Sequence, residues 1–295
     1  MKRVLAALSF GGLVIASSSA SAFLCTRTPS LGPSVAWNVR DVVVHRSGAG
    51  AENDAAAIDD AVQAGLDQWS GLACSDLQLT LGAPTTSKLV GFDWHAGSDD
   101  PRNENIIVFR NDTPGDPLDA WLHTFGALAI TTVTFESTTG RLVDADIEMN
   151  DVSFEFSACD PLAVDCQVEF DLQNTLTHEL GHVIGLDHPL ISDDGASEAT
   201  MFASASRGDI GKRDIAADDE AGLCTIYPAG EPAGECFGVG RPDPPAVRFE
   251  QTLCASGGSS TDAPSSGALV LGALLVATCR TRGRKRDEAE LDHIT

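Results

Sequence analysis

THELGHVIGLDH, which runs from Thr177 to His188, is the most informative segment of this chain of 295 residues, because it holds three of the chain's seven histidines. A separation of four residues places His178 and His182 one turn apart on the same face of a helix, so both rings can reach one ion. Gly185 allows the left-handed turn that would end this helix. His188 would then return from a different direction as a third ligand.

Three nitrogen ligands leave the fourth position of a tetrahedral zinc ion open for water, which is typical of catalytic rather than structural zinc. Glu179 is one position round the helix from His178, so its carboxylate would lie close to the ion without binding it. Such a carboxylate can accept a proton from water and act as a general base. The alternative is a solvated helix face that carries these residues by chance, and the length of the whole pattern argues against it.

The pattern HExxHxxGxxH resembles the zinc signature of the metzincin metallopeptidases, and Gly-Leu-Asp-His at its end is similar to the matrixin branch. Upstream, Gly126-Ala127-Leu128-Ala129 resembles the matrixin edge strand that pairs with the substrate backbone. This resemblance makes Leu128, Ala129 and Ile130 candidate substrate-binding residues. Residues 144–148 follow as the next strand does in that family.

Downstream of the histidines, Ala199-Thr200-Met201-Phe202 resembles the Met-turn, whose methionine packs beneath the zinc site. Residues 218–223 with Tyr227 resemble the closing helix, so the resemblance covers roughly residues 54–228. Two departures limit what it implies. Matrixins place structural-zinc histidines where this chain has Ile130 and Asp146, so one catalytic zinc is expected and no second one. Ala203 stands where related families have a zinc-binding tyrosine, so no fifth ligand is expected.

Periodicity gives the order of the elements. A helix capped by Asn53 or Asp54 and running to about Leu72 repeats apolar residues at helical spacing. Runs typical of strands follow at 77–81, 105–110, 128–135, 142–149 and 152–156, and helical stretches at about 172–184 and 217–226. This order indicates an α+β domain. The resemblance implies a twisted, mostly parallel sheet with an antiparallel edge strand, packed on two long helices, with a third helix at the C-terminal end.

The two ends of the chain look like targeting segments. Lys2 and Arg3, an apolar run and small residues up to Ala22 predict a secretory signal over 1–22. Residues 23–228 would form the matrixin-like catalytic domain, and 229–266 a linker rich in Pro, Gly and Ser. The tail 267–295, apolar and then basic, is similar to the C-terminal sorting signals of myxobacterial surface proteins; the alternative is a weak membrane anchor. The chain is therefore expected to be exported, and either secreted or attached to the cell surface or outer membrane.

The eight cysteines fit an oxidising compartment. Setting aside Cys254 and Cys279 near the C-terminus leaves six, which allow fifteen pairings. Sequence proximity favours Cys159 with Cys166 and Cys224 with Cys236, and leaves Cys25 for Cys74. Cys25 could instead be a thiolate that blocks the zinc, which the same compartment argues against.

The formal net charge of −24 argues against nucleic acid as a partner, because a polyanion is bound by clustered Lys and Arg. The acidic clusters at 99–100, 144–151 and 193–194 could supply oxygen ligands to Ca²⁺, or be solvated loops, which is the favoured interpretation in so acidic a chain. His45, His95 and His123 are isolated and are expected to be surface or core residues rather than ligands.

The sequence thus predicts a zinc-dependent metalloendopeptidase that hydrolyses protein or peptide substrates. The alternative, from another class, is a non-catalytic surface or adhesion module that keeps the metal only for folding, since zinc binding can supply folding free energy. The presence of Glu179 favours the enzyme, because a purely structural site needs no base.

Overall fold

The structure, a computed structural model, describes residues 23–48, 55–97, 100–164, 166–190 and 195–236, together with the backbone of two short strands, β11 and β12. The predicted signal segment 1–22, the predicted cap residues Asn53 and Asp54, and most of the predicted linker and tail lie outside the described residues.

One mixed sheet forms the centre of the fold, with the strand order β12-β5-β6-β4-β2-β3. The strands are β2 (Asp41–Ser47), β3 (Gln78–Leu81), β4 (Asn105–Arg110), β5 (Ala129–Glu136), β6 (Leu142–Asn150) and β12 (Leu291–Ile294). Neighbours from β3 to β6 run parallel, whereas β5 is antiparallel to β6. On its other edge, β5 pairs with β12 only at residues 133–136. The predicted α+β class and the mostly parallel sheet with an antiparallel strand are confirmed.

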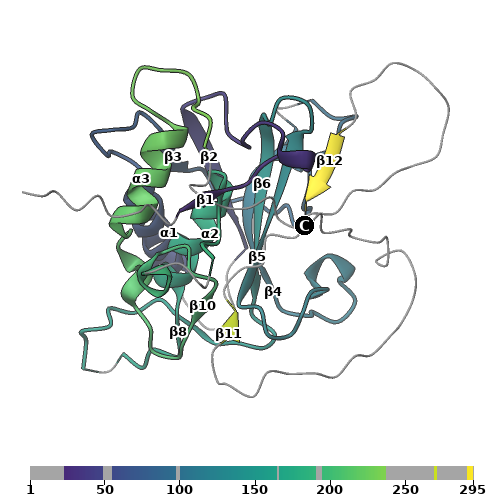
Figure 1. The fold of residues 1–295 in the computed structure, drawn as a ribbon. Helices are drawn as coiled ribbons and strands as arrows, with labels where there is room; N and C mark the ends of the chain where they lie inside the picture. Colours follow the sequence, from purple (N-terminus) through teal and green to yellow (C-terminus); the bar gives the residue numbers. More distant parts are fainter. Residues whose placement is uncertain are drawn as a thin grey trace, which may run out of the picture.

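Three helices, α1 (Ala55–Trp69), α2 (Leu172–Val183) and α3 (Ala217–Ile226), gather on one side of the sheet (Figure 1). The predicted apolar stripe of α1 is fully buried, and its last residue, Trp69, donates a hydrogen bond from its indole nitrogen to the Thr177 carbonyl of α2 at 2.8 Å. Sheet and helices therefore share one core, which fixes α2 against its neighbours. Among the described residues, no helix is both long and apolar enough to cross a membrane.

Short elements complete the fold. They include β1 (Leu24–Cys25) paired with β9 (Leu186–Asp187), β7 (Phe156–Ser157) paired with β8 (Phe170–Asp171), and β10 (Ser204–Ala205) paired with β11 (Leu269–Val270). Single 3₁₀ turns lie at Pro29–Leu31, Pro101–Asn103, Pro117–Asp119, Ala196–Glu198 and Gly211–Arg213.

Most predicted elements are confirmed, and β4 and α3 have the predicted bounds. The strand predicted at 152–156 is wrong, because Asp151 to Ser153 form a turn and only Phe156 enters β7. The prediction omitted β2, although its Val42-Val43-Val44 run is typical of a strand. This strand is central, since it pairs with both β3 and β4.

Three disulfides join the six cysteines of the described domain. The predicted Cys159–Cys166 bond is confirmed, whereas the other two predicted pairs are wrong. Cys25 bonds to Cys236 and Cys74 to Cys224, across sequence separations of 211 and 150 residues. Proximity in sequence failed because the packed domain brings together segments that are far apart in the sequence. Residues 229–236, which the sequence assigns to the linker, consequently pack against the domain.

Candidate metal centre

Helix α2 and the turn after it position the three histidines. The Asp171 side chain caps the helix by accepting a hydrogen bond from the Asn174 N–H at 2.8 Å. Gly185 ends the helical segment with φ of 92°, and a Cβ there would lie 2.2 Å from the Val35 carbonyl oxygen. Only glycine fits both the backbone angle and this close approach. The chain then enters β9, whose pairing with β1 fixes the direction from which His188 returns.

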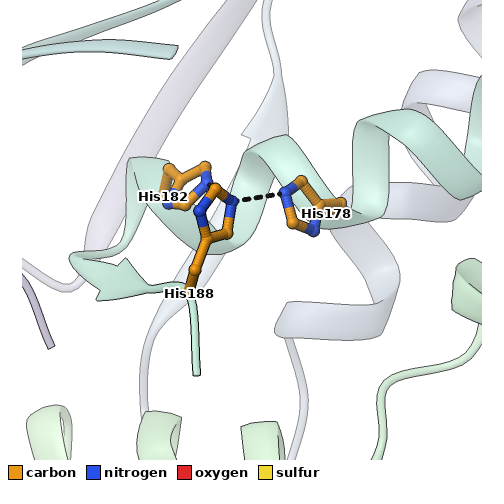
Figure 2. A group of neighbouring side chains, drawn as sticks. All are labelled: His178, His182 and His188. Carbon is orange, nitrogen blue, oxygen red and sulfur yellow. Dashed lines mark hydrogen bonds between the residues drawn. The ribbon is translucent and has the colours of Figure 1, made fainter. Parts of the chain in front are cut away.

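The three imidazole rings converge on one point (Figure 2). The Nε2 atom of His188 lies 3.1 Å from Nε2 of His178 and 3.1 Å from Nε2 of His182. In the two histidines of α2, the Nδ1 atom lies on the side of the ring away from this point and contacts a backbone carbonyl. The carbonyl is that of Thr200 for His178, at 2.7 Å, and that of Leu186 for His182, at 2.9 Å. Because a carbonyl only accepts, both Nδ1 atoms carry the proton, and both Nε2 atoms present lone pairs to the centre.

This arrangement fits a bound cation. Burial lowers the pKa of His178 and of His182, and lowers that of His188 to about 2, so the rings are neutral at ordinary pH. The Nε2 atom of His188 can hold at most one proton, which cannot satisfy both neighbouring lone pairs well. A positive ion at the centre would satisfy all three. Three neutral imidazoles are a typical donor set for catalytic zinc, and His188 is the ligand that is partly exposed to solvent.

Glu179 is fully buried beside this cluster. Its Oε2 atom accepts a hydrogen bond from the Thr131 hydroxyl of β5 at 2.6 Å. Its Oε1 atom is buried and has no hydrogen-bond partner in the part of the chain that the structure describes. Burial raises the pKa of Glu179 to about 7. One oxygen is thus held in place by the sheet, and the other is left available for a proton from outside the protein.

Met201 packs directly against the helix that carries two of the ligands. A Cβ at Gly181, next to His182, would lie 2.1 Å from the Met201 sulfur and 3.1 Å from the Trp69 ring. The methionine turn is fixed by Asp219 of α3, which accepts the N–H of Thr200 at 2.5 Å and that of Met201 at 3.4 Å. Thr200 in turn holds the His178 ring, so the turn supports the cluster from below.

Sequence reasoning missed two residues at this centre, Thr131 and Lys212. Lys212 is buried, its ammonium group donates to the Phe202 carbonyl, and its Nζ atom lies 3.4 Å from Nδ1 of His178. Burial lowers the pKa of Lys212 to about 7. Its backbone N–H donates to the Asn174 side chain of α2 at 2.7 Å. A single lysine in a polar segment gives no signal of burial, whereas Thr131 directly follows the predicted edge residues and could have been included.

The remaining sequence candidates lie elsewhere. Leu128, Ala129 and Ile130 are buried at the start of β5, where no strand in the described ranges pairs with the outer edge. His45, His95 and His123 join no metal-binding group among the residues described, and His123 instead contacts Glu148 at 2.9 Å. A second grouping, of Cys74, Cys224 and Glu220, has its two cysteines joined in a disulfide and is therefore no metal site.

Comparison with known families adds one match: residues 93–228 match the model of the Matrixin family. The comparison with curated proteins found no match. The matched segment contains β4 to β6, all three histidines, Met201 and α3. The α+β fold, the Matrixin match and the three converging histidines together support a metzincin-like zinc peptidase.

Proposed function

We propose that this protein is a zinc-dependent metalloendopeptidase that cleaves peptide bonds in protein substrates, with His178, His182 and His188 as ligands and Glu179 as general base. The observation that carries the proposal is the buried, unpartnered Oε1 atom of Glu179 next to the ring cluster. A site that held zinc only for folding would have no use for a buried carboxylate oxygen without a partner, since such a group is costly to keep.

The substrate would bind as an extended strand along the open edge of β5, at Leu128, Ala129 and Ile130. An added strand satisfies backbone hydrogen bonds without reading the side chains, which suits an endopeptidase. The pairing would also place one peptide bond beside Glu179, because Thr131 of the same strand contacts that carboxylate.

When bound, zinc would polarise the scissile carbonyl and lower the pKa of the attacking water. Glu179 would take the proton from this water at Oε1 and pass it to the departing amine, while Thr131 holds Oε2 in place. A pKa near 7 suits a group that first accepts and then donates a proton. Water is the nucleophile, so no covalent intermediate with the protein forms.

The test is the variant Glu179→Ala, assayed on a generic protein substrate such as casein. We expect the rate of cleavage to fall by about 10²–10⁴-fold, which is the usual contribution of a general base, while the protein still binds one equivalent of zinc. Glu155→Gln, at an exposed carboxylate, is the matched control and should keep full activity. Wild-type cleavage by the Glu179→Ala protein would refute the assignment, and a zinc-loaded wild type that cleaves nothing would favour the non-catalytic module.

We also propose that the protein is exported. The signal-like segment 1–22 and the three disulfides support this, because disulfides persist in oxidising compartments. Whether the chain is then secreted or held at the cell surface depends on the tail 267–295. Fractionation of cells that express the full chain and a chain lacking 267–295 tests both points. Export predicts that neither form remains in the cytoplasm, and attachment predicts that only the truncated form is released.

A further inference from the structure

The loop that leads into β5 exposes large apolar side chains. It runs from Asn111, directly after β4, to Leu128, directly before β5. The residue exposure is 83% for Leu122, 75% for Phe125 and 47% for Leu118. Apolar residues that are exposed singly are normal on a protein surface, whereas several of them on one loop mark an interaction site.

Buried polar contacts fix this loop to the rest of the domain. In the middle of the loop, Asp119 is buried and accepts a hydrogen bond from the ammonium group of Lys88 at 2.8 Å. Further along, the His123 ring contacts one carboxylate oxygen of the buried Glu148 of β6 at 2.9 Å. The other oxygen of Glu148 accepts a hydrogen bond from Arg110 of β4 at 2.6 Å. Two buried carboxylates therefore anchor the loop.

Apolar packing fixes the same loop at its C-terminal end. Trp121 and Ala127 of the loop are buried together with Ile130 of β5 in a small cluster apart from the main core. Leu122 directly follows the buried tryptophan, and Phe125 lies between the two buried loop residues, yet both stay exposed. The loop thus holds these two side chains in solvent before any partner binds, so a partner that covers them loses little binding energy to ordering the loop.

The loop continues the edge of β5 along which the substrate is proposed to bind, and the inference rests on that proposed function. Farther along the same edge, at residues 133–136, β12 pairs antiparallel with β5, so this edge accepts an antiparallel strand. In an antiparallel substrate, the residues that follow the cleaved bond run toward the start of β5. With the cleaved bond beside Thr131 and a rise of about 3.4 Å per residue, the substrate reaches the turn at Phe125 about three or four residues later.

We propose that Leu122 and Phe125 form an apolar subsite for the substrate, which binds a large apolar side chain about three or four residues to the C-terminal side of the cleaved bond. His123, the ionisable residue between them, turns inward to Glu148, so the surface that the two side chains offer is apolar. Covering them with a leucine or phenylalanine of the substrate removes apolar surface of both partners from water. The favoured substrates are therefore extended protein segments with an apolar residue at that position.

The experiment uses the full chain loaded with zinc, and pairs of peptides built on a casein site that the protein cleaves. The two peptides of a pair differ only in having leucine or serine at the third, or at the fourth, residue after the cleaved bond. We expect kcat/KM to be about tenfold higher for the leucine peptide of one pair, because its side chain leaves water on binding. In the double variant Leu122→Ser with Phe125→Ser, this ratio should fall below about twofold.

Two further variants separate loss of the subsite from general damage. Phe125→Leu keeps an apolar side chain and should retain most of the preference for leucine. Val39→Ser, at an exposed apolar residue before β2, is the matched control and should keep the wild-type ratio. Equal kcat/KM for both peptides of each pair in the wild type, or an undiminished preference in the double variant, would overturn the inference and leave the proposed function intact. A wild type that cleaves no casein would overturn the proposed function and the inference with it.

Discussion

The two faces of the β5–β6 hairpin bury polar groups in different ways. On the helix side, the Thr131 hydroxyl donates to Glu179, and the nearby imidazoles are fixed by hydrogen bonds to backbone carbonyls. On the outer side, Thr132 and Thr134 have no partners among the described residues. The helix side therefore presents nitrogen lone pairs in a rigid frame, whereas the outer side presents oxygens on the strands themselves.

This difference shows that one sheet can bury polar groups in two distinct ways. The nitrogen donors reach the metal centre only because α2 packs across the sheet and the chain turns back at Gly185 after the helix ends. Oxygen donors need no second element, since strand alternation and cross-strand register already bring Thr132 beside Asp146. Three nitrogen donors in a fixed arrangement suit zinc. The two faces should then respond independently to mutations.

The strongest test of the helix side is His182→Ala. Two ligands cannot hold zinc as three do, so we expect bound zinc and cleavage to be lost completely. Metal analysis and a casein assay measure these effects. Zinc and cleavage retained in a folded His182→Ala protein would show that His182 is not a ligand.

A smaller effect is expected from Gly181→Ala, which leaves every ligand in place. The added methyl group would lie 2.1 Å from the Met201 sulfur, so the methionine must move and the turn beneath the cluster must shift. We expect a loss of about 1–3 kcal/mol in unfolding free energy, as for an overpacked core, with reduced cleavage. Gly97→Ala is the matched control, because a Cβ there meets nothing within 4 Å. Equal stability of the two variants would mean that Met201 does not press on α2.

The sequence predicted the zinc side of this comparison far better than the outer side. Spacing alone identifies His178, His182 and His188. Residues four apart lie on the same face of a helix, which pairs His178 with His182, and His188 follows soon after the end of that helix. It also identifies Gly185 as the residue that ends the helix. Those inferences depend on local geometry, and the structure brings the three rings together as predicted.

Features that depend on packing between distant segments could not be predicted in the same way. Cys25 lies next to Cys236 only after the domain has folded, so sequence proximity gave two wrong disulfides. Lys212 is buried against His178 although its neighbours in sequence are polar. Asp144 and Asp146 were grouped with solvated acidic loops, and only the register of β5 and β6 shows that both are buried beside threonines.

The finest test of the two faces uses one substitution at adjacent positions. Thr131→Val removes the hydroxyl that donates to Glu179, and hydrogen bonds to charged groups contribute about 1.5–3 kcal/mol. We therefore expect kcat/KM to fall by roughly tenfold or more with zinc retained. Thr132→Val makes the same change one residue later, where side chains point to the outer face. It should leave kcat/KM within about twofold, because its hydroxyl has no protein partner among the described residues. Equal losses of cleavage in the two variants would show that the hairpin responds as one unit, whereas a loss in Thr131→Val alone would show that a step of one residue separates the catalytic face from the outer face.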